Sequence, residues 1–191
     1  MKSGIDHGMK KLTTKEIAMK LFMSVMFFFV TSCLMAQSRE LPTVSQVEIN
    51  RYVGKWYAVA ALPQFFTRKC LAQTADYAVI NEQTISVLNT CLKGKSKTTI
   101  DGQAVVTNAA TNAELEVTFN NFFTRLFRVK GDYNIIALDE KYENVMIGTQ
   151  DRESLWIMSR SPNMDQATYT KYVELAKDLG FPVEKLILSK F

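Results

Sequence analysis

The chain has 191 residues, of which 47% are hydrophobic and 22% charged, and its formal net charge is +4. This length suits one globular domain with a sizeable core. The first 36 residues hold five lysines and two acids, which leaves 18 basic and 17 acidic side chains beyond them. The basic balance therefore belongs to the N-terminal segment and gives no indication of a nucleic-acid partner.

Residues 1–36 are predicted to be a secretory signal. Lysines precede an apolar run from Leu21 to Ala36, and its 16 residues fall short of the roughly 20 that a membrane-spanning helix needs. Residues 30–33 (Val-Thr-Ser-Cys) resemble a lipobox, in which Cys33 would be lipidated and would anchor an outer-membrane lipoprotein facing the periplasm. Cleavage after Ala36 would instead release a soluble periplasmic or secreted protein. The lipoprotein and the periplasmic form both belong to the cell envelope, whereas a secreted form would leave it. Residues 37–46 are expected to be a linker and residues 47–191 the folded domain.

The histidine and cysteine contents limit the chemistry of the mature chain. The only histidine, His7, lies in the signal, so the mature part has no Ser-His-Asp or Cys-His set and no histidine-based metal site. This argues against an enzyme and predicts neither a metal nor a cofactor. Cys70 and Cys91 remain, and in an exported protein they are expected to form a disulfide, the alternative being two reduced thiols.

From Gly54 onward, strand patterns recur with turns between near neighbours and no helix interposed. Residues 74–80 and 84–91 flank a turn near Glu82 and predict a hairpin, in which facing residue numbers sum to about 164. Cys70 and Cys91 sum to 161, so a small register shift would bring them together. The meander predicts an all-β fold, an antiparallel barrel or sandwich of eight strands: residues 57–62, 74–80, 84–91, 98–107, 113–119, 133–139, 144–149 and 155–160.

One helix is predicted after the strands. Asp165 suits its N-cap, Gly180 its C′ position, and Pro182 prevents its continuation. Its apolar stripe is expected to cover an outer patch of the sheet, with Ile157 as a candidate contact; the stripe consists of Tyr169, Tyr172, Val173, Ala176 and Leu179. Residues 183–188 are predicted to form a short ninth strand.

Three motifs occur in order along this series: Gly54-x-Trp56 at the first strand, Leu138-Asp139 with Tyr142 after the sixth, and residues 159–162 (Ser-Arg-Ser-Pro) after the eighth. Together they resemble the motifs of the lipocalin family, and they are most similar to its bacterial outer-membrane lipocalin and apolipoprotein D branch. One departure is Leu138-Asp139, where Thr-Asp-Tyr is common in that branch.

The resemblance covers about residues 47–190. It implies an eight-stranded antiparallel up-and-down β-barrel with the C-terminal helix packed outside and a short ninth strand. It also implies that Arg160 packs across Trp56, and that the motif residues Gly54, Trp56, Asp139 and Arg160 have structural roles. An Arg over an indole would tie the first strand to the eighth and close one barrel end.

An eight-stranded barrel has an interior wide enough for one small ligand. The alternation of residue types predicts an apolar and aromatic lining with a few polar tips, which suits an acyl chain or another elongated molecule with a small polar group. A filled core is the alternative. The predicted lining consists of Ala75, Tyr77, Val87, Asn89, Leu115, Val117, Phe119, Tyr133, Ile135, Ile147, Trp156 and Met158.

The resemblance implies a binding protein for small hydrophobic ligands, most naturally fatty acids or lysophospholipids, in lipid transport, storage or salvage. A pigment or tetrapyrrole carrier for bilin or haem is one alternative. A lipocalin-fold enzyme is another, and a filled barrel whose outer surface binds a protein partner is a third. A homodimer is also left open.

Three loops are expected at the barrel end opposite Trp56, the mouth: residues 65–69, 93–97 and 122–130. Phe-Phe-Thr-Arg occurs in two of them, and Phe65 and Phe66 are expected to contact the ligand. We expect this rim to receive anionic lipid, as a ligand head group or as a membrane surface; solvated loop charges are the alternative. Its basic residues are Arg68, Lys69, Lys93, Lys95, Lys97, Arg125, Arg128 and Lys130.

Overall fold

The computed structural model describes residues 40–65, 67–120 and 130–191. The predicted signal with Cys33 lies outside these residues, as do Phe66, Arg125 and Arg128. The part from Glu40 to Phe191 is one compact unit.

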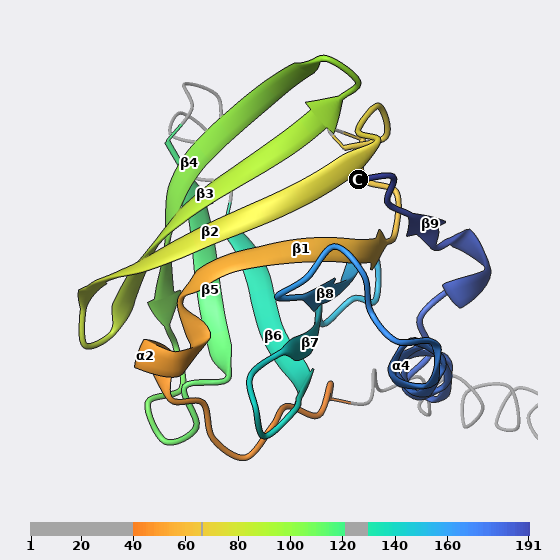
Figure 1. Ribbon diagram of the computed structural model, residues 1–191. Helices are drawn as coiled ribbons and strands as arrows, with labels where there is room; N and C mark the ends of the chain where they lie inside the picture. Colours follow the sequence, from red (N-terminus) through yellow and green to blue (C-terminus); the bar gives the residue numbers. More distant parts are fainter. Residues whose placement is uncertain (1–39, 66, 121–129) are drawn as a thin grey trace, which may run out of the picture. The chain divides into compact units, whose positions relative to one another are not determined.

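Eight antiparallel strands form a closed barrel in this unit (Figure 1). Each strand pairs with the next in chain order, and β1 pairs with both β8 and β2, which closes the sheet. The predicted up-and-down barrel is therefore confirmed. Its strands are β1 (Gly54–Ala61), β2 (Ala72–Asn81), β3 (Thr84–Lys93), β4 (Ser96–Val106), β5 (Glu114–Phe119), β6 (Lys130–Leu138), β7 (Asn144–Gly148) and β8 (Leu155–Ser159).

The alternation of side chains sets which face of each strand is buried. In β5, Leu115 and Val117 are buried, whereas their neighbours Glu116 and Thr118 are half-buried. A strand turns successive side chains to opposite faces, so this pattern directs one set into the barrel. In β1 the register shifts between Ala58 and Ala60, so that later residues of the strand pack on the outside instead.

The predicted disulfide between Cys70 and Cys91 is present, with 5.3 Å between the Cα atoms. The expected register shift beside it is wrong. The pairs from Ala72 with Leu92 to Val79 with Ile85 all keep the predicted register. Cys70 reaches its partner because it lies before β2, where Leu71 donates its backbone N–H to the Leu92 carbonyl at 2.7 Å.

Helix α4 (Gln166–Asp178) packs against the outer face of the barrel. Asp165 caps it by accepting the backbone N–H of Thr168 at 3.0 Å. At its other end Gly180 has φ +87°, and the backbone of Gly180 and Phe181 donates to Lys177 and Ala176, which is a Schellman ending. The predicted partner Ile157 shares a buried cluster with the helix residues Tyr172 and Ala176.

The segment after α4 corrects one prediction. Residues 183–188 do not form a continuous strand: Val183–Lys185 is a 3-10 turn (η2), and only Ile187–Leu188 forms β9, paired with Ala60–Ala61 of β1. The turn begins at Pro182, whose carbonyl accepts the backbone N–H of Lys185 at 3.0 Å. The fixed φ of proline suits the start of such a turn.

Candidate functional site

One end of the barrel is closed by Trp56. A short helix, α2 (Ile49–Tyr52), leads into β1, and the Trp56 side chain behind it is fully buried. Its indole N–H donates to the Tyr52 carbonyl at 2.8 Å. The guanidinium carbon of Arg160 lies 3.7 Å from the ring centre, so the contact that the resemblance implied is present.

Arg160 also binds the backbone that precedes and begins β1. Its guanidinium donates at 2.9 Å to the carbonyls of Arg51, Tyr52, Val53 and Lys55. Gly54 has φ +99°, and an added Cβ would lie 3.3 Å from Nη1 of Arg160. Glycine is therefore required at this position for its backbone conformation and for the close approach of the guanidinium.

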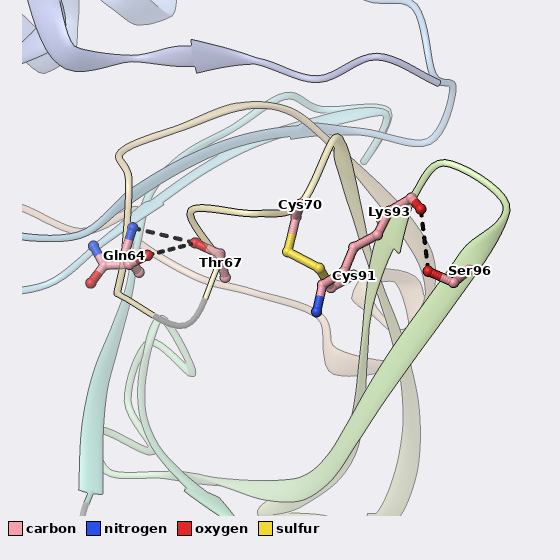
Figure 2. Close-up of a disulfide and its surroundings, with 6 residues drawn as sticks. All are labelled: Gln64, Thr67, Cys70, Cys91, Lys93 and Ser96. Carbon is pink, nitrogen blue, oxygen red and sulfur yellow. Dashed lines mark hydrogen bonds between the residues drawn. A yellow bond between two sulfur atoms is a disulfide. The ribbon is translucent and has the colours of Figure 1, made fainter.

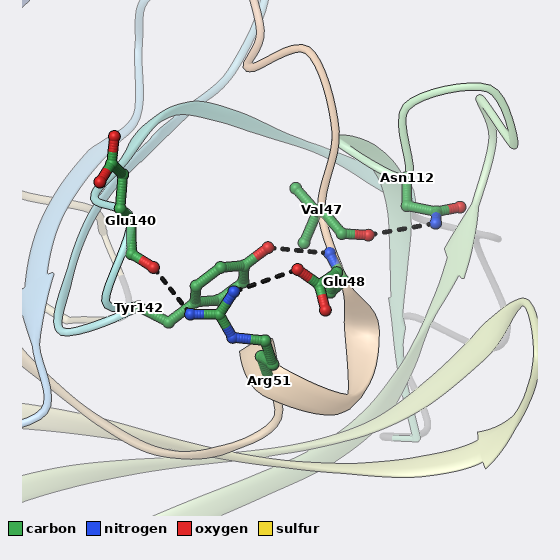
Figure 3. Close-up of polar contacts among 6 residues, drawn as sticks. All are labelled: Val47, Glu48, Arg51, Asn112, Glu140 and Tyr142. Carbon is green, nitrogen blue, oxygen red and sulfur yellow. Dashed lines mark hydrogen bonds and ion pairs between the residues drawn. The ribbon is translucent and has the colours of Figure 1, made fainter.

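The second motif shapes the turn beside this plug. Asp139 accepts the backbone N–H of Glu143 at 3.0 Å and the side-chain amide of Asn144 at 2.7 Å. The turn presents Tyr142, whose hydroxyl accepts the backbone N–H of Glu48 at 3.0 Å and whose ring lies 4.0 Å from the guanidinium carbon of Arg51 (Figure 3). All three motifs thus meet at the closed end, with α2 between them.

The predicted lining residues lie together inside the barrel. Eight of them are buried in a single cluster with Trp56, and Phe119, Tyr133 and Trp156 pack against it half-buried. Asn89 follows Val87 on the same face of β3, and its side-chain oxygen is buried without a hydrogen-bond partner. The eight buried members are Ala75, Tyr77, Val87, Leu115, Val117, Ile135, Ile147 and Met158.

Three tyrosines form a hydrogen-bonded chain within this cluster. The Tyr133 hydroxyl lies 2.5 Å from that of Tyr52 and 3.1 Å from that of Tyr77. The rings of Tyr52 and Tyr77 are stacked with their centres 5.9 Å apart. Burial raises the pKa of Tyr77 to about 12 and raises the pKa values of Tyr52 and Tyr133 well above 10, so all three are neutral hydrogen-bonding groups at neutral pH.

Tyr52 was not predicted from the sequence. It lies in a helical turn, so the two-residue alternation that identifies inward residues of strands does not apply to it. Its signal was the apolar spacing of Ile49 and Tyr52, three residues apart on one face of α2. Other members of the cluster were also missed although the same two-residue alternation marks them: Ile85, Ala104, Val106, Ala113 and Val145. Ile85, Ala113 and Val145 each extend a predicted inward set by one step toward the closed end, whereas Ala104 and Val106 lie in β4, for which no inward residue was predicted.

At the opposite end, the disulfide joins the end of the β1–β2 loop to β3, two residues before that strand ends (Figure 2). Phe65 is on the outside of this end with 80% of its surface exposed, and the guanidinium carbon of Arg68 lies 4.6 Å from its ring centre. Lys69, Lys93, Lys95 and Lys97 are exposed on the same loop and turn. Lys130 is at the start of β6 and forms an ion pair of 2.7 Å with Glu116.

Within residues 40–65, 67–120 and 130–191, no cluster of His, Cys, Asp or Glu side chains could hold a metal ion. In the same residues no helix is long and apolar enough to cross a membrane.

A closed eight-stranded barrel with one plugged end, an apolar lining and an outer helix defines the class of small up-and-down barrels. Residues 47–190 match the family model described as a lipocalin-like domain. The chain belongs to the lipocalin family.

Several relatives cover nearly the whole chain. It is 33% identical over 171 residues to the outer membrane lipoprotein Blc of Vibrio cholerae, covering 87% of this chain and 95% of that protein. It is also 33% identical over 155 residues to temperature-induced lipocalin-1 of Arabidopsis thaliana, covering 80% and 83%. Insecticyanin of the tobacco hornworm Manduca sexta has a similar fold, with a TM-score of 0.60, 16% identity, and coverage of 80% of this chain and 85% of that one.

Proposed function

We propose that this protein is a carrier for fatty acids or lysophospholipids in the cell envelope, and that it acts by binding rather than by catalysis. Membership in the lipocalin family implies a small hydrophobic ligand. The observation that carries the proposal for this chain is a gradient of burial along the inner face of the barrel.

From Ala113, which directly precedes β5, the exposed fraction of successive inward side chains rises toward the mouth, from 0% at Ala113 to 3% at Leu115 and 7% at Val117, and Phe119 is only half-buried. The same change occurs in β3 and β8, where Val87 and Met158 are buried and Asn89 and Trp156 half-buried; β2 and β4 do not show it. A core filled along its whole length would bury both halves alike. The gradient supports an interior that opens at the end opposite Trp56.

The chemistry of this lining supports the ligand class. The predicted inward residues include no charged side chain, so an apolar chain can enter without meeting a buried charge. Asn89 holds an unpartnered buried oxygen, and a ligand hydroxyl, such as that on the glycerol of a lysophospholipid, would donate to it. A buried acceptor of this kind is costly unless a partner is supplied.

The location is supported by the N-terminal segment and by the relatives. Residues 21–36 have the length and composition of a signal, and proteins similar to this one are outer membrane lipoproteins in Vibrio cholerae and Escherichia coli. We propose that Cys33 carries the lipid and holds the barrel at the outer membrane. The ligand would then be collected and released at a membrane surface.

Native mass spectrometry of the purified processed protein, followed by lipid extraction, tests the proposal directly. We expect one acyl lipid per barrel and a first residue at position 33 or 37. Displacement of a fluorescent fatty acid by lysophosphatidylcholine then tests Asn89. Asn89→Leu should weaken lysophospholipid binding about tenfold, while Asn163→Leu, at an exposed site before α4, should not. A protein without lipid that binds no probe would show that the barrel is filled.

A further inference from the structure

We propose that one flank of the barrel mouth docks on an anionic lipid surface, independently of any lipid at the N-terminus. This docking flank consists of the described part of the β1–β2 loop (residues 62–65 and 67–71), the β3–β4 turn with the strand residues beside it (residues 93–97) and the C-terminal segment (residues 187–191). The C-terminal segment was assigned no role from sequence. The inference goes beyond the proposed function, because a barrel can carry a ligand whether or not this surface binds a membrane.

The apolar part of the docking flank is unusually exposed. Phe65 has 80% of its surface exposed, and four further large apolar side chains are between 47% and 58% exposed. Among the described residues, nine large hydrophobics are at least 41% exposed, and five of them belong to the docking flank. Exposed apolar groups gathered in this way mark a contact surface. The four are Leu71, Ile187, Leu188 and Phe191.

The three segments are held together by named contacts. Lys190 donates its backbone N–H to the Leu71 carbonyl at 2.8 Å, which places the C-terminal segment beside the β1–β2 loop. The ring of Phe191 lies 5.3 Å from that of Tyr57 on β1. The disulfide then ties the end of the β1–β2 loop to the end of β3 (Figure 2). The apolar side chains are therefore presented on one supported surface.

The same segments carry a concentrated positive charge. Residues 62–71 and 93–97 hold five basic side chains and no acidic one: Arg68, Lys69, Lys93, Lys95 and Lys97. All five are exposed, and none takes part in an ion pair found within the described residues. The acids Asp151 and Glu153 lie in the β7–β8 loop, which borders the docking flank where Gln64 donates to the Glu153 carbonyl at 2.9 Å; these two acids leave the five basic side chains in excess. The net field of the docking flank therefore favours an anionic partner.

A second copy of the chain fits this surface poorly. In a two-fold dimer the same patch faces itself, so the five basic side chains would meet their own copies. The edge of the sheet offers little pairing, because β9 has two residues and lies between Lys185 and Lys190, and lysines beside an edge strand discourage pairing with another strand.

An anionic lipid surface matches both the apolar and the basic side chains of the docking flank. Phenylalanine rings enter the boundary between head groups and acyl chains, while lysine and arginine stems extend to the phosphates. Each basic residue near such a surface strengthens binding severalfold at low ionic strength. The mouth opens beside the same loops, so a docked barrel could exchange its ligand with the bilayer over a short path.

The experiment measures co-sedimentation of the mature protein beginning at Gln37, the product of cleavage after Ala36, so that no lipid anchor contributes. Vesicles of phosphatidylcholine alone are compared with vesicles that also contain phosphatidylglycerol, at low and high salt. We expect stronger binding to the anionic vesicles and weaker binding at high salt. Replacing Lys93, Lys95 and Lys97 together by Gln should weaken binding roughly a hundredfold at low salt.

Matched variants separate the docking flank from the rest of the surface. Phe65→Ser with Phe191→Ser should lower binding at least about tenfold at both salt concentrations. Leu88→Ser, at a 41% exposed site in the middle of β3, should leave it unchanged, as should Gln at the exposed Lys141, Lys171 and Lys177. Displacement of a fluorescent fatty acid without vesicles reports ligand binding separately, and in Leu88→Ser and the control lysine variants it should match that of the native chain.

Three results would overturn the inference. Equal affinity for neutral and anionic vesicles would show that the basic side chains do not attract the protein to anionic lipid. Losses of equal size in the Leu88 or control lysine variants would show that the docking flank is not special. A concentration-dependent dimer in sedimentation, abolished by Phe191→Ser, would assign the surface to self-association instead.

Discussion

Arg160 and Trp56 join the two ends of the strand series: the guanidinium carbon lies 3.7 Å from the centre of the indole ring. One residue directly follows β8 and the other lies near the start of β1. The same guanidinium binds four carbonyls before and at the start of β1. The Arg160 side chain therefore closes this barrel end in two ways: it packs on the Trp56 ring, and it donates hydrogen bonds to the backbone before and at the start of β1.

Arg160→Ala should lower the free energy of unfolding by about 3 kcal/mol, because it removes the ring contact and leaves several carbonyls without a charged donor. The effect on ligand affinity should be smaller, because the mouth is at the other end. Thermal unfolding and probe displacement measure the two quantities. Arg160→Lys should recover part of the stability, since an ammonium keeps the charge but not the planar set of donors. An unchanged melting temperature in Arg160→Ala would contradict this role.

The disulfide should stabilise the mouth end of the β2–β3 hairpin. Cys70 and Cys91 are 21 residues apart, and a link that closes a loop of this size stabilises by about 3 kcal/mol. We expect Cys70→Ser with Cys91→Ser to lower the midpoint of denaturant unfolding accordingly. Hydrogen exchange should quicken in residues 67–73 and 90–97 and stay slow near Trp56. Faster exchange of equal size at both ends would mean that the bond supports the whole barrel.

The N-cap of α4 gives a pH-dependent prediction. Hydrogen bonds from the side chain and backbone of Thr168 lower the pKa of Asp165 below 3.8. A lowered pKa in the folded state contributes stability above the unfolded value, and this contribution is lost as the pH falls through the folded value. Asp165→Ala should therefore melt a few degrees lower at neutral pH, and the difference should fade below about pH 4.

Asp165→Asn is the control for that experiment, because an Asn side chain also accepts the Thr168 N–H but does not titrate in this range. Its melting temperature should stay closer to that of the native chain at neutral pH than that of Asp165→Ala. A difference between native chain and Asp165→Ala that persists unchanged into strong acid would show that the ionised carboxylate is not what stabilises the helix start.

Much of the barrel could be predicted from the sequence, because its strands, helix ends and hairpin register are set by residues close together in the chain. The two-residue alternation of Leu115 and Val117 requires only that one face of a strand be buried. The cap at Asp165 and the ending at Gly180 also depend on a few adjacent residues. The register of the β2–β3 hairpin followed from its turn, since a short turn fixes which residues face each other.

What could not be predicted depends on contacts between distant residues. The carbonyls bound by Arg160 lie more than a hundred positions away along the chain, and no local pattern shows them. The strand predicted over residues 183–188 was shortened because Pro182 begins a turn there. The exposure of Phe191 and its closeness to the β1–β2 loop follow from the pairing of β9 with β1. The sequence of Ile187 and Leu188 does not show which strand they pair with.

The buried tyrosines predict how the barrel fails at high pH. Burial raises the pKa of Tyr77 to about 12 and those of Tyr52 and Tyr133 well above 10. For groups whose pKa is raised on folding, the stabilisation is fully present below the unfolded value of 10 and is lost as the pH rises through the folded value. We therefore expect the free energy of unfolding to be flat up to about pH 10 and to fall steeply between about pH 10 and 12.

Tyr133→Phe tests this chain of hydroxyls, because the Tyr133 oxygen is the one bonded to both of the others. Removing it leaves two buried hydroxyls without that partner, which should cost about 1–3 kcal/mol at neutral pH. Denaturant unfolding across the pH range, followed together with tyrosinate absorbance, measures both effects. The native chain should show late, cooperative ionisation of part of its tyrosines that coincides with unfolding. If all tyrosines ionised near pH 10 while the barrel stayed folded, the hydroxyl chain would have to be open to water.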